Sequence, residues 1–281
     1  ILINEDIGAG TARNLGVSNA RYSHVTFVDV DDYISKDYIQ AHFDVMGKNI
    51  ITFSEIHDVI DDEIISDNSI NQEIIDNQAT GSVPLSKLNR IASITVCKVI
   101  PKEIALLQKF REYLRSGEDT VYYSELFVNS RPLLKVISLE SNAIYYRRIR
   151  ENSISRKEGN FDFLVFQRLE ILEILDKILS QINNPSLILF VRSKYNAQIS
   201  FMNRYLKENP SERETVINAI KLMSLDHFNY SILNRGFAKT LVLSYCFPPY
   251  SDTSATIVAK RLINENKVVD VVSNNLTRIR T

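Results

Sequence analysis

Residues 24–32, HVTFVDVDD, join an apolar run to three aspartates, and this combination narrows the folds open to the chain. The run is rich in Val, Phe and Thr, so we expect a buried strand over residues 24–30. Carboxylates gathered at the end of a strand repel one another unless a cation or a positively charged ligand lies among them. Because Mg²⁺ and Mn²⁺ prefer oxygen ligands, Asp29, Asp31 and Asp32 are candidate metal ligands. A solvated turn with an aspartate N-cap is the simpler alternative.

Two better-known motifs do not account for this part of the chain. The GAG at residues 8–10 could begin a G-x-G-x-x-G dinucleotide fingerprint, but Arg13 occupies the third glycine position. An EF-hand is disfavoured, because the aspartate loop lacks an acid or Asn at its fifth position and Gly at its sixth. We therefore expect GAG to lead into a short helix over residues 10–22.

The composition is typical of a soluble globular protein with a sizeable core. The chain has 281 residues, 44% hydrophobic and 24% charged, and its net charge of −1 provides no global field for nucleic acid. Cys97 and Cys246 lie far apart without a CxxC pattern, which indicates a reducing compartment and no structural zinc. No apolar run approaches the roughly 20 residues of a transmembrane helix. Because the chain opens on Ile1, we expect a fragment of a longer protein.

Apolar spacing predicts a change of organisation along the chain. Strand-like and helical segments alternate in the first half, with an amphipathic helix expected over residues 102–114. Residues 61–80 are acidic and rich in Asn, which predicts a mobile, solvated segment. From about residue 160 to about residue 230, apolar residues at i, i+3, i+4 and i+7 predict helices. Residues 239–275 then show the pattern of strand, proline-containing loop, helix and strand.

Two further motifs could carry chemistry. Residues 117–120, GEDT, place two acids at the start of a predicted helix, which is also a common capping arrangement. Residues 145–157, YYRRIRENSISRK, are rich in arginine, and guanidinium groups suit phosphate oxygens. A solvated basic segment is the alternative for this run.

Together the three motifs resemble one family. The order ARNLG and TFVDVDD, then GEDT about 85 residues later, then YYRRIRENSIS, is similar to GT-A-type, family 2 glycosyltransferases. The resemblance covers residues 1–157, and the combination is far more specific than any single motif. It implies an α/β fold with an incomplete GT-A-type domain, since the strand, nucleotide-binding loop and βα units that begin the family's fold have no counterpart in this sequence.

The resemblance implies a donor site formed by the first two motifs. The A-R-N helix of the family lies beside the sugar nucleotide, which makes Arg13 and Asn14 nucleotide contacts. The D-x-D-D motif binds the ribose and a divalent cation on the diphosphate, so Mn²⁺ or Mg²⁺ is the implied cofactor. Asp31 is the first choice for this metal, with Asp29 and Asp32 beside it, and Asp29 and Asp31 are also implied to contact the nucleotide sugar.

The resemblance also implies a base and a closing segment. In inverting members the E-D pair supplies the general base, which corresponds to Asp119, with Glu118 beside it. The segment of the family that bears Tyr, Arg and Ser closes over the diphosphate and corresponds to Tyr146, Arg150 and Ser153, spaced here as Y-x-x-x-R-x-x-S. An acceptor hydroxyl would attack C1 of the donor sugar, a nucleoside diphosphate would leave, and the anomeric configuration would be inverted.

The end of the chain resembles a second family. Residues 241–262, LVLSYCFPPYSDTSATIVAKRL, are similar to the first strand, loop and helix of a GT-B-type, family 4 glycosyltransferase. An ordinary βα turn with prolines is the alternative. The expected organisation is a partial GT-A-like domain over residues 1–157, a helical extension over 158–236 and the start of a GT-B-like Rossmann domain over 237–281.

These features predict a metal-dependent inverting glycosyltransferase of capsule, teichoic-acid or lipopolysaccharide synthesis, acting in the cytoplasm at the inner face of the membrane. The expected partners are a UDP-linked sugar and a glycan or lipid-linked acceptor, without nucleic acid. Peripheral membrane association and homo-oligomerisation are left open. Two alternatives remain: an inactive transferase remnant that serves as an interaction module, and a nucleotidyltransferase, which shares the metal–diphosphate chemistry.

Overall fold

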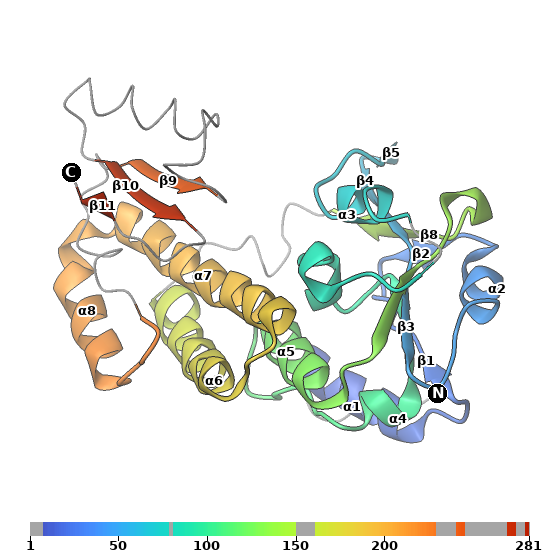
Figure 1. Ribbon diagram of the computed structural model, residues 1–281, viewed down its shortest axis with the longest axis horizontal. Helices are drawn as coiled ribbons and strands as arrows, with labels where there is room; N and C mark the ends of the chain where they lie inside the picture. Colours follow the sequence, from blue (N-terminus) through green and yellow to red (C-terminus); the bar gives the residue numbers. More distant parts are fainter. Residues whose placement is uncertain are drawn as a thin grey trace. The chain divides into compact units, whose positions relative to one another are not determined.

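The computed structural model describes residues 8–78, 81–149 and 161–228, together with the backbone of three strands nearer the C-terminus. The chain forms two compact units, Ile1–His227 and Phe228–Thr281. The described part of the first unit is mixed α/β, as predicted, with two four-stranded sheets (Figure 1). None of the helices that the structure describes combines the length and the apolar character needed to cross a bilayer.

The first sheet has the strand order β1-β6-β3-β7. β6 pairs antiparallel with both β1 and β3, and β7 pairs parallel with β3. Figure 1 shows this sheet between α2 on one side and α5 on the other, which buries its central side chains. The bounds are His24–Val25 (β1), Lys98–Pro101 (β6), Ile50–Phe53 (β3), Leu133–Val136 (β7), Tyr38–Phe43 (α2) and Glu118–Ser130 (α5).

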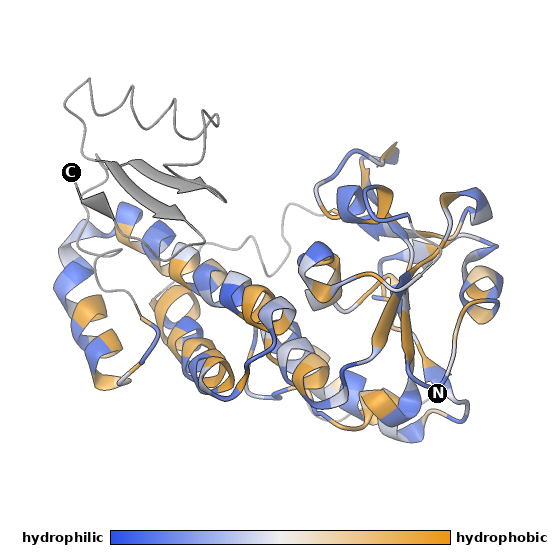
Figure 2. Cartoon of the chain, viewed as in Figure 1, coloured by the Kyte–Doolittle hydropathy of each residue, from blue (hydrophilic) through white to orange (hydrophobic). Residues whose placement is uncertain are grey.

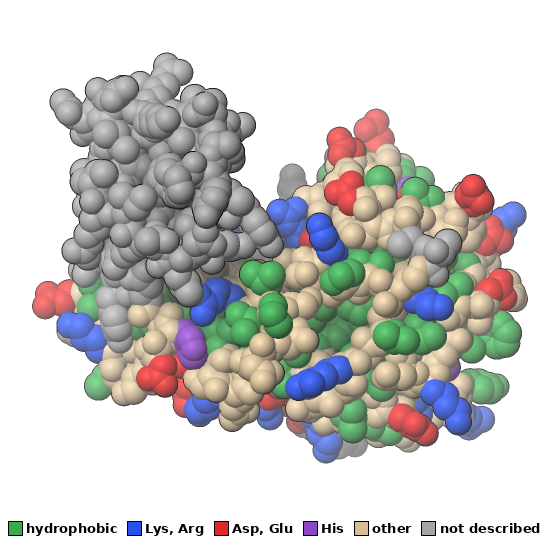
Figure 3. Space-filling model, in the orientation of Figure 1, with side chains coloured by type: hydrophobic (Ala, Val, Ile, Leu, Met, Phe, Trp, Pro, Cys, Tyr) green, Lys and Arg blue, Asp and Glu red, His purple; other side chains and the backbone are tan. Residues whose placement is uncertain are grey.

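The second sheet has the order β2-β8-β4-β5. Alternate residues face opposite sides of a strand, so Tyr145 and Ile56 are buried while Tyr33 and Tyr146 lie on the more exposed face. Acidic side chains gather over the β5 end of this sheet on the face seen in Figure 3. The bounds are Tyr33–Ile34 (β2), Ile144–Arg148 (β8), Glu55–Ile60 (β4) and Glu63–Ile65 (β5).

The acidic segment after β4 contains regular structure that was not predicted, although residues 61–67 are exposed, as expected of a solvated segment. It contains β5 and the short helix α3 (Asn71–Ile75). The side chain of Asn71 is fully buried, accepts a hydrogen bond from the Ile56 N–H at 3.1 Å and donates one to the Ser66 carbonyl at 3.0 Å. A buried amide with both of its functions paired stabilises a segment whose composition predicts disorder.

Two other predicted elements are shorter than expected. The strand over residues 24–30 is paired only at His24–Val25, opposite Pro101 and Ile100 of β6. The helix expected over residues 102–114 ends early, since α4 spans Lys102–Ala105. Leu106 and Leu107 directly beyond it are about half exposed, whereas Phe110 and Leu114 are buried from the irregular segment that follows.

The helical region after residue 160 is confirmed and packs on α5. A π-helical turn, η5 (Asp162–Phe166), leads into α6 (Gln167–Gln181), which is followed by α7 (Pro185–Glu208) and α8 (Arg213–Leu222). α6 and α7 both contact α5, and apolar residues line the facing sides of these helices (Figure 2). The other elements that the structure describes in this unit are α1 (Ala9–Asn19), η1 (Leu85–Lys87), η2 (Ile91–Ser93), η3 (Leu139–Ser141) and η6 (Pro210–Glu212).

The second unit contains a three-stranded sheet of order β11-β10-β9. β9 (Thr240–Ser244) and β10 (Val269–Ser273) pair in parallel, and β11 (Ile279–Arg280) pairs antiparallel with β10. A parallel pair agrees with the predicted strand–helix–strand pattern. Residues 245–268, where the helix is predicted, lie outside the described part of the chain. The GT-B character of this unit and the boundaries at residues 157 and 236 stay predictions.

Candidate active site

Arg13 of α1 joins two of the acidic motifs. Its guanidinium group donates from Nη1 to Glu118 Oε1 at 2.7 Å and from Nη2 to Asp29 Oδ1 at 3.3 Å. It also lies over the Phe110 ring, 5.5 Å from the centroid. Burial acts to lower the pKa of Arg13, but the charges of Glu118 and Asp29 outweigh it, so this pKa is raised. One cation therefore connects the aspartate turn after β1 with the acids that begin α5.

Asp119 lies in the first turn of α5, directly after Glu118. Gly117 precedes the helix with a left-handed φ of 84°, and the Asp119 carboxylate accepts the Thr120 N–H at 2.6 Å. Burial raises the pKa of Asp119 to about 6, and the neighbouring Glu118 charge acts in the same direction. The Thr120 N–H and the cations Arg13 and Lys98 oppose this rise. A carboxyl group with a pKa near neutrality is suited to general-base chemistry.

Lys98 of β6 lies beside this acidic pair and was not predicted as a site residue. Its side chain is fully buried, and its ammonium group donates to the Ala92 carbonyl at 2.8 Å and to the Ile94 carbonyl. It lies 3.9 Å from the ring centroid of Tyr123, which follows Asp119 by one helical turn. Burial lowers the pKa of Lys98 to about 7, against the attraction of Cys97 and Asp119. The available signal was a single lysine within the apolar run SITVCKVIP.

The three aspartates of the DVDD motif have different surroundings. The Asp32 N–H donates to the Asp29 carbonyl at 3.0 Å, which closes a turn around Asp31. The Asp29 side chain is 48% exposed and faces Arg13. Asp32 instead turns toward β8, where Oδ2 accepts the Tyr145 hydroxyl at 2.7 Å and Oδ1 accepts the Arg148 N–H at 2.8 Å. Burial raises the pKa of Asp32 against these two hydrogen bonds.

The three carboxylates of the DVDD motif could supply only one or two ligands to a divalent cation. No group of three or more His, Cys, Asp or Glu side chains suited to a metal gathers among the described residues. Both carboxylate oxygens of Asp32 already accept hydrogen bonds, which leaves Asp29 and Asp31 as the better candidates. Mg²⁺ in nucleotide sites commonly takes one or two carboxylates and completes its shell with phosphate oxygens and water. The metal roles of Asp29, Asp31 and Asp32 stay predictions.

Asn14 and the GAG stretch hold α1 against a neighbouring loop. The Asn14 side-chain amide donates to the Phe110 carbonyl and to Glu112 Oε1, both at 3.0 Å, and its oxygen accepts the Phe110 N–H at 2.9 Å. A Cβ on Gly10 would come within 3.2 Å of the Phe110 Cβ, so the close approach favours glycine. These contacts give Asn14 a packing role, and its nucleotide contact stays a prediction.

The residues expected to close over the diphosphate are only partly described. Tyr146 of β8 stacks on Tyr33, with ring centroids 4.7 Å apart, and His57 meets its ring edge-on at 5.9 Å. The strand that carries Tyr146 also holds Asp32, through Tyr145 and the Arg148 N–H. Arg150 and Ser153 lie outside the described residues. The roles of these three residues at the diphosphate stay predictions.

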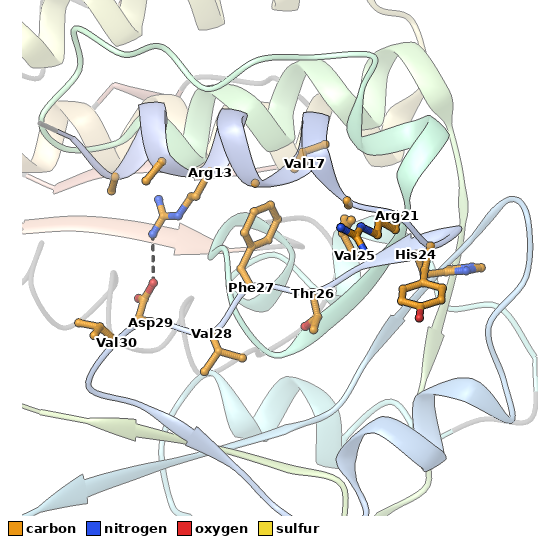
Figure 4. Close-up of a pocket in the computed structure, with 15 residues that line it drawn as sticks. Arg13, Val17, Arg21, His24, Val25, Thr26, Phe27, Val28, Asp29 and Val30 are labelled. Atoms are coloured by element: carbon orange, nitrogen blue, oxygen red, sulfur yellow. Dashed lines mark hydrogen bonds and ion pairs between the residues drawn. The ribbon is translucent and has the colours of Figure 1, made fainter. Parts of the chain in front are cut away.

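A cavity of about 700 Å³ runs between α1 and the segment that follows it. Figure 4 shows Arg13 and Asp29 together at one end, with Arg21 and His24 at the other. Ala12, Gly16 and Val17 of α1 line one wall, and Phe27 projects from the opposite segment toward the helix (Figure 4). The volume lies within the range of small-molecule sites, which are mostly apolar with a few polar groups that set orientation.

Comparisons with known proteins find bacterial glycosyltransferases. No protein-family model matches the chain. Glycosyltransferase GlyA of Streptococcus pneumoniae is 28% identical over 162 residues, 54% of this chain and 23% of the relative. Poly(ribitol-phosphate) beta-N-acetylglucosaminyltransferase TarS of Staphylococcus aureus is 25% identical over 222 residues, 76% of this chain and 36% of the relative. The chain thus spans about a quarter to a third of the length of these relatives.

The fold agrees with that of a solved glycosyltransferase. The crystal structure of residues 1–349 of S. aureus TarS, in complex with UDP-GlcNAc, matches 77% of this chain and 61% of that chain, with a TM-score of 0.56 and 19% identity. At this identity the match shows a common fold. The chain is therefore similar in sequence to bacterial glycosyltransferases and shares the fold of one of them.

Proposed function

We propose that this chain belongs to a glycosyltransferase that moves a sugar from a UDP-linked donor to an acceptor hydroxyl of a cell-envelope polysaccharide, with inversion of the anomeric centre. The observation that carries the proposal is the Arg13 guanidinium between Asp29 and Glu118, because it joins an aspartate turn beside a large cavity to the residue before Asp119. A transferase needs a donor site and a base within reach of one another.

In the proposed mechanism Asp119 accepts the proton of the attacking hydroxyl. A base works best when its pKa lies close to the working pH, and burial moves the pKa of Asp119 in that direction. Negative charge develops on the departing diphosphate, and fixed cations stabilise such charge. Arg13 contacts the aspartate turn through Asp29, and its planar group suits phosphate oxygens.

A divalent cation is proposed as the cofactor. When bound, it would supply Lewis-acid neutralisation of the diphosphate, and Asp31 with Asp29 would hold it. A poly(ribitol phosphate) acceptor and a GlcNAc donor are suggested by TarS, which is named for these two groups and was solved with UDP-GlcNAc. Teichoic acid, capsule and lipopolysaccharide stay predicted acceptors. A cytoplasmic location at the inner membrane face is part of the same proposal.

The test is calorimetric binding of UDP to the 281-residue chain with and without Mn²⁺. Binding that requires Mn²⁺, is lost in Asp31→Ala and is kept in Asp67→Ala would support the donor site, since Asp67 is an exposed carboxylate outside it. Asp119→Asn should not weaken UDP binding, because the proposed base serves the acceptor. Binding that is unchanged in Asp31→Ala would contradict the metal assignment, and no binding at millimolar UDP would contradict a donor site on this chain.

A further inference from the structure

Arg168 is a buried cation of the helical extension, a region for which the sequence predicts no site. Only 1% of its surface is exposed. Its guanidinium group donates in three directions, to the Phe163 carbonyl at 3.1 Å, to Gln198 Oε1 of α7 at 3.2 Å and to the Ser116 carbonyl at 3.1 Å. It therefore ties α6 and α7 to the loop that leads into α5.

The contact reaches the residue at which α5 begins. Gly117 follows Ser116, and a Cβ on Gly117 would lie 3.3 Å from Arg168 Nη1 and 2.6 Å from Ile171 Cδ1. The Arg115 N–H is also held from α6, by Gln167 Oε1 at 3.2 Å. The helical extension thus determines the path of the backbone directly before Glu118 and Asp119.

We propose that Arg168 is a positioning residue for the base: by holding the Ser116 carbonyl beside Gly117, it sets where α5 begins and where the Asp119 carboxylate lies. This inference rests on the proposed function of Asp119. It gives the helical extension a part in the chemistry, although α6 supplies no group to the cavity along α1. A buried guanidinium with three fixed acceptors can hold a loop more rigidly than a flexible ammonium group can.

The charge of Arg168 also acts on the Asp119 carboxylate. Burial lowers the pKa of Arg168 to about 10, and the charges of Asp119 and Glu118 oppose that fall. The charged and titratable groups that act on Asp119 come from five of the described elements, and Cys97 lies beside two of them, Lys98 and Tyr123. The cations are Arg13 of α1, Lys98 of β6, Arg168 of α6 and Lys194 of α7, and the acidic groups are Glu118 and Tyr123 of α5. Removing one of these cations should make Asp119 harder to ionise.

The experiment titrates the Asp119 carboxyl group by ¹³C NMR in the 281-residue chain, with Asp119→Asn to assign the signal. We expect Arg168→Met to raise the titration midpoint by about half a unit to one unit, less than the shift from a directly paired cation. Arg204→Met is the matched control, because Arg204 is an exposed arginine of α7 that lies over the Phe201 ring also contacted by Arg168. The control should leave the midpoint unchanged.

A second variant covers the case in which Arg168→Met does not fold. Arg168→Lys keeps the charge but loses the planar fork, so we expect a nearly unchanged midpoint and an exchange of the Val121 amide that is faster by about tenfold. That amide bonds to the Gly117 carbonyl at 3.2 Å and so reports the first turn of α5. An unshifted midpoint in a folded Arg168→Met, or unchanged Val121 exchange in Arg168→Lys, would overturn the inference. Neither measurement needs substrate, so a failure of the transferase proposal would be seen separately, in the UDP experiment.

Discussion

Replacement of Asp119 by asparagine separates stability from the proposed chemistry. Asparagine has nearly the same shape, and its amide oxygen can still accept the Thr120 N–H that Asp119 accepts at 2.6 Å. What changes is the charge, which burial and Glu118 disfavour. We therefore expect the variant to lose sugar transfer and to be more stable than the native chain above neutral pH.

The size of the stability gain follows from the pKa of Asp119. Folding raises this pKa from an ordinary 3.8 to about 6, and each unit corresponds to about 1.4 kcal/mol. The difference sets an upper limit of about 3 kcal/mol. Because Asp119 is partly exposed and solvent screens its charge, we expect a gain of about 1–2 kcal/mol.

The direction of the Asp119 pKa shift also predicts how the stability difference between the two proteins depends on pH. Below about pH 4 the carboxyl group is protonated in both the folded and the unfolded chain, so the native chain and the Asp119→Asn variant should not differ through this charge. Between about pH 4 and about pH 6 the unfolded chain ionises first, and the native fold loses stability relative to the variant. Above about pH 7 the difference should be constant.

The measurement is urea unfolding followed by far-UV circular dichroism at about pH 4.5 and about pH 8, since the described helices of the first unit dominate that signal. Asp67→Asn, which removes an exposed carboxylate, controls for general charge effects. A variant that is no more stable than the native chain at the higher pH, or a gain of equal size at both pH values, would refute the account of Asp119 as a charge disfavoured by burial.

Three further replacements test other contacts of the site. Arg13→Lys should weaken UDP binding about tenfold or more, because one ammonium group cannot reproduce the fork between two carboxylates; native affinity by calorimetry would contradict this. Tyr145→Phe should lower the free energy of unfolding by about 1–2 kcal/mol, since Asp32 loses a buried partner; an unchanged urea midpoint would exclude that contribution. Gly117→Ala should cost about 1–3 kcal/mol, from the left-handed φ and the approach to Ile171, and an equally stable variant in the same assay would show that the loop relaxes freely.

Helices that are marked by capping residues or by a regular apolar spacing could be predicted from the amino-acid sequence. The glycine and two acids of GEDT mark the start of α5, and the structure places Gly117 in the left-handed conformation directly before that helix. The helical period after residue 160 likewise appears as α6 and α7. In both cases the evidence lies within a few neighbouring residues, as capping and amphipathicity require.

The missed features depend on contacts between distant parts of the chain. Tyr145 holds Asp32 across 113 positions, and Arg168 holds Ser116 across 52. Neither pairing leaves a periodic signal in a single sequence. Asn71 shows the same limit, because an Asn-rich segment is expected to be solvated until the partners of its buried amide are known.

The position of Arg13 would make the proposed donor site and the proposed base interdependent. Its charge lowers the pKa of Asp119, while its nearest partners are Glu118 and Asp29. A bound diphosphate would add negative charge near this cation and compete for it, so UDP should raise the pKa of Asp119. Because linkage is reciprocal, protonation of Asp119 must then strengthen UDP binding by the same factor.

This coupling can be measured without an acceptor. The affinity of the native chain for UDP should rise as the pH falls from about 8 to about 5.5, because Asp119 becomes protonated. Asp119→Asn resembles the protonated base, so its affinity should lack the part of the rise that comes from Asp119. Titration of UDP itself affects both proteins equally and cancels in the ratio of their affinities. A ratio that does not change with pH would mean that Arg13 serves the donor and the base independently. A ratio that approaches one at low pH would mean that donor binding holds back the ionisation of the base, which places proton transfer and diphosphate departure under the control of one guanidinium group.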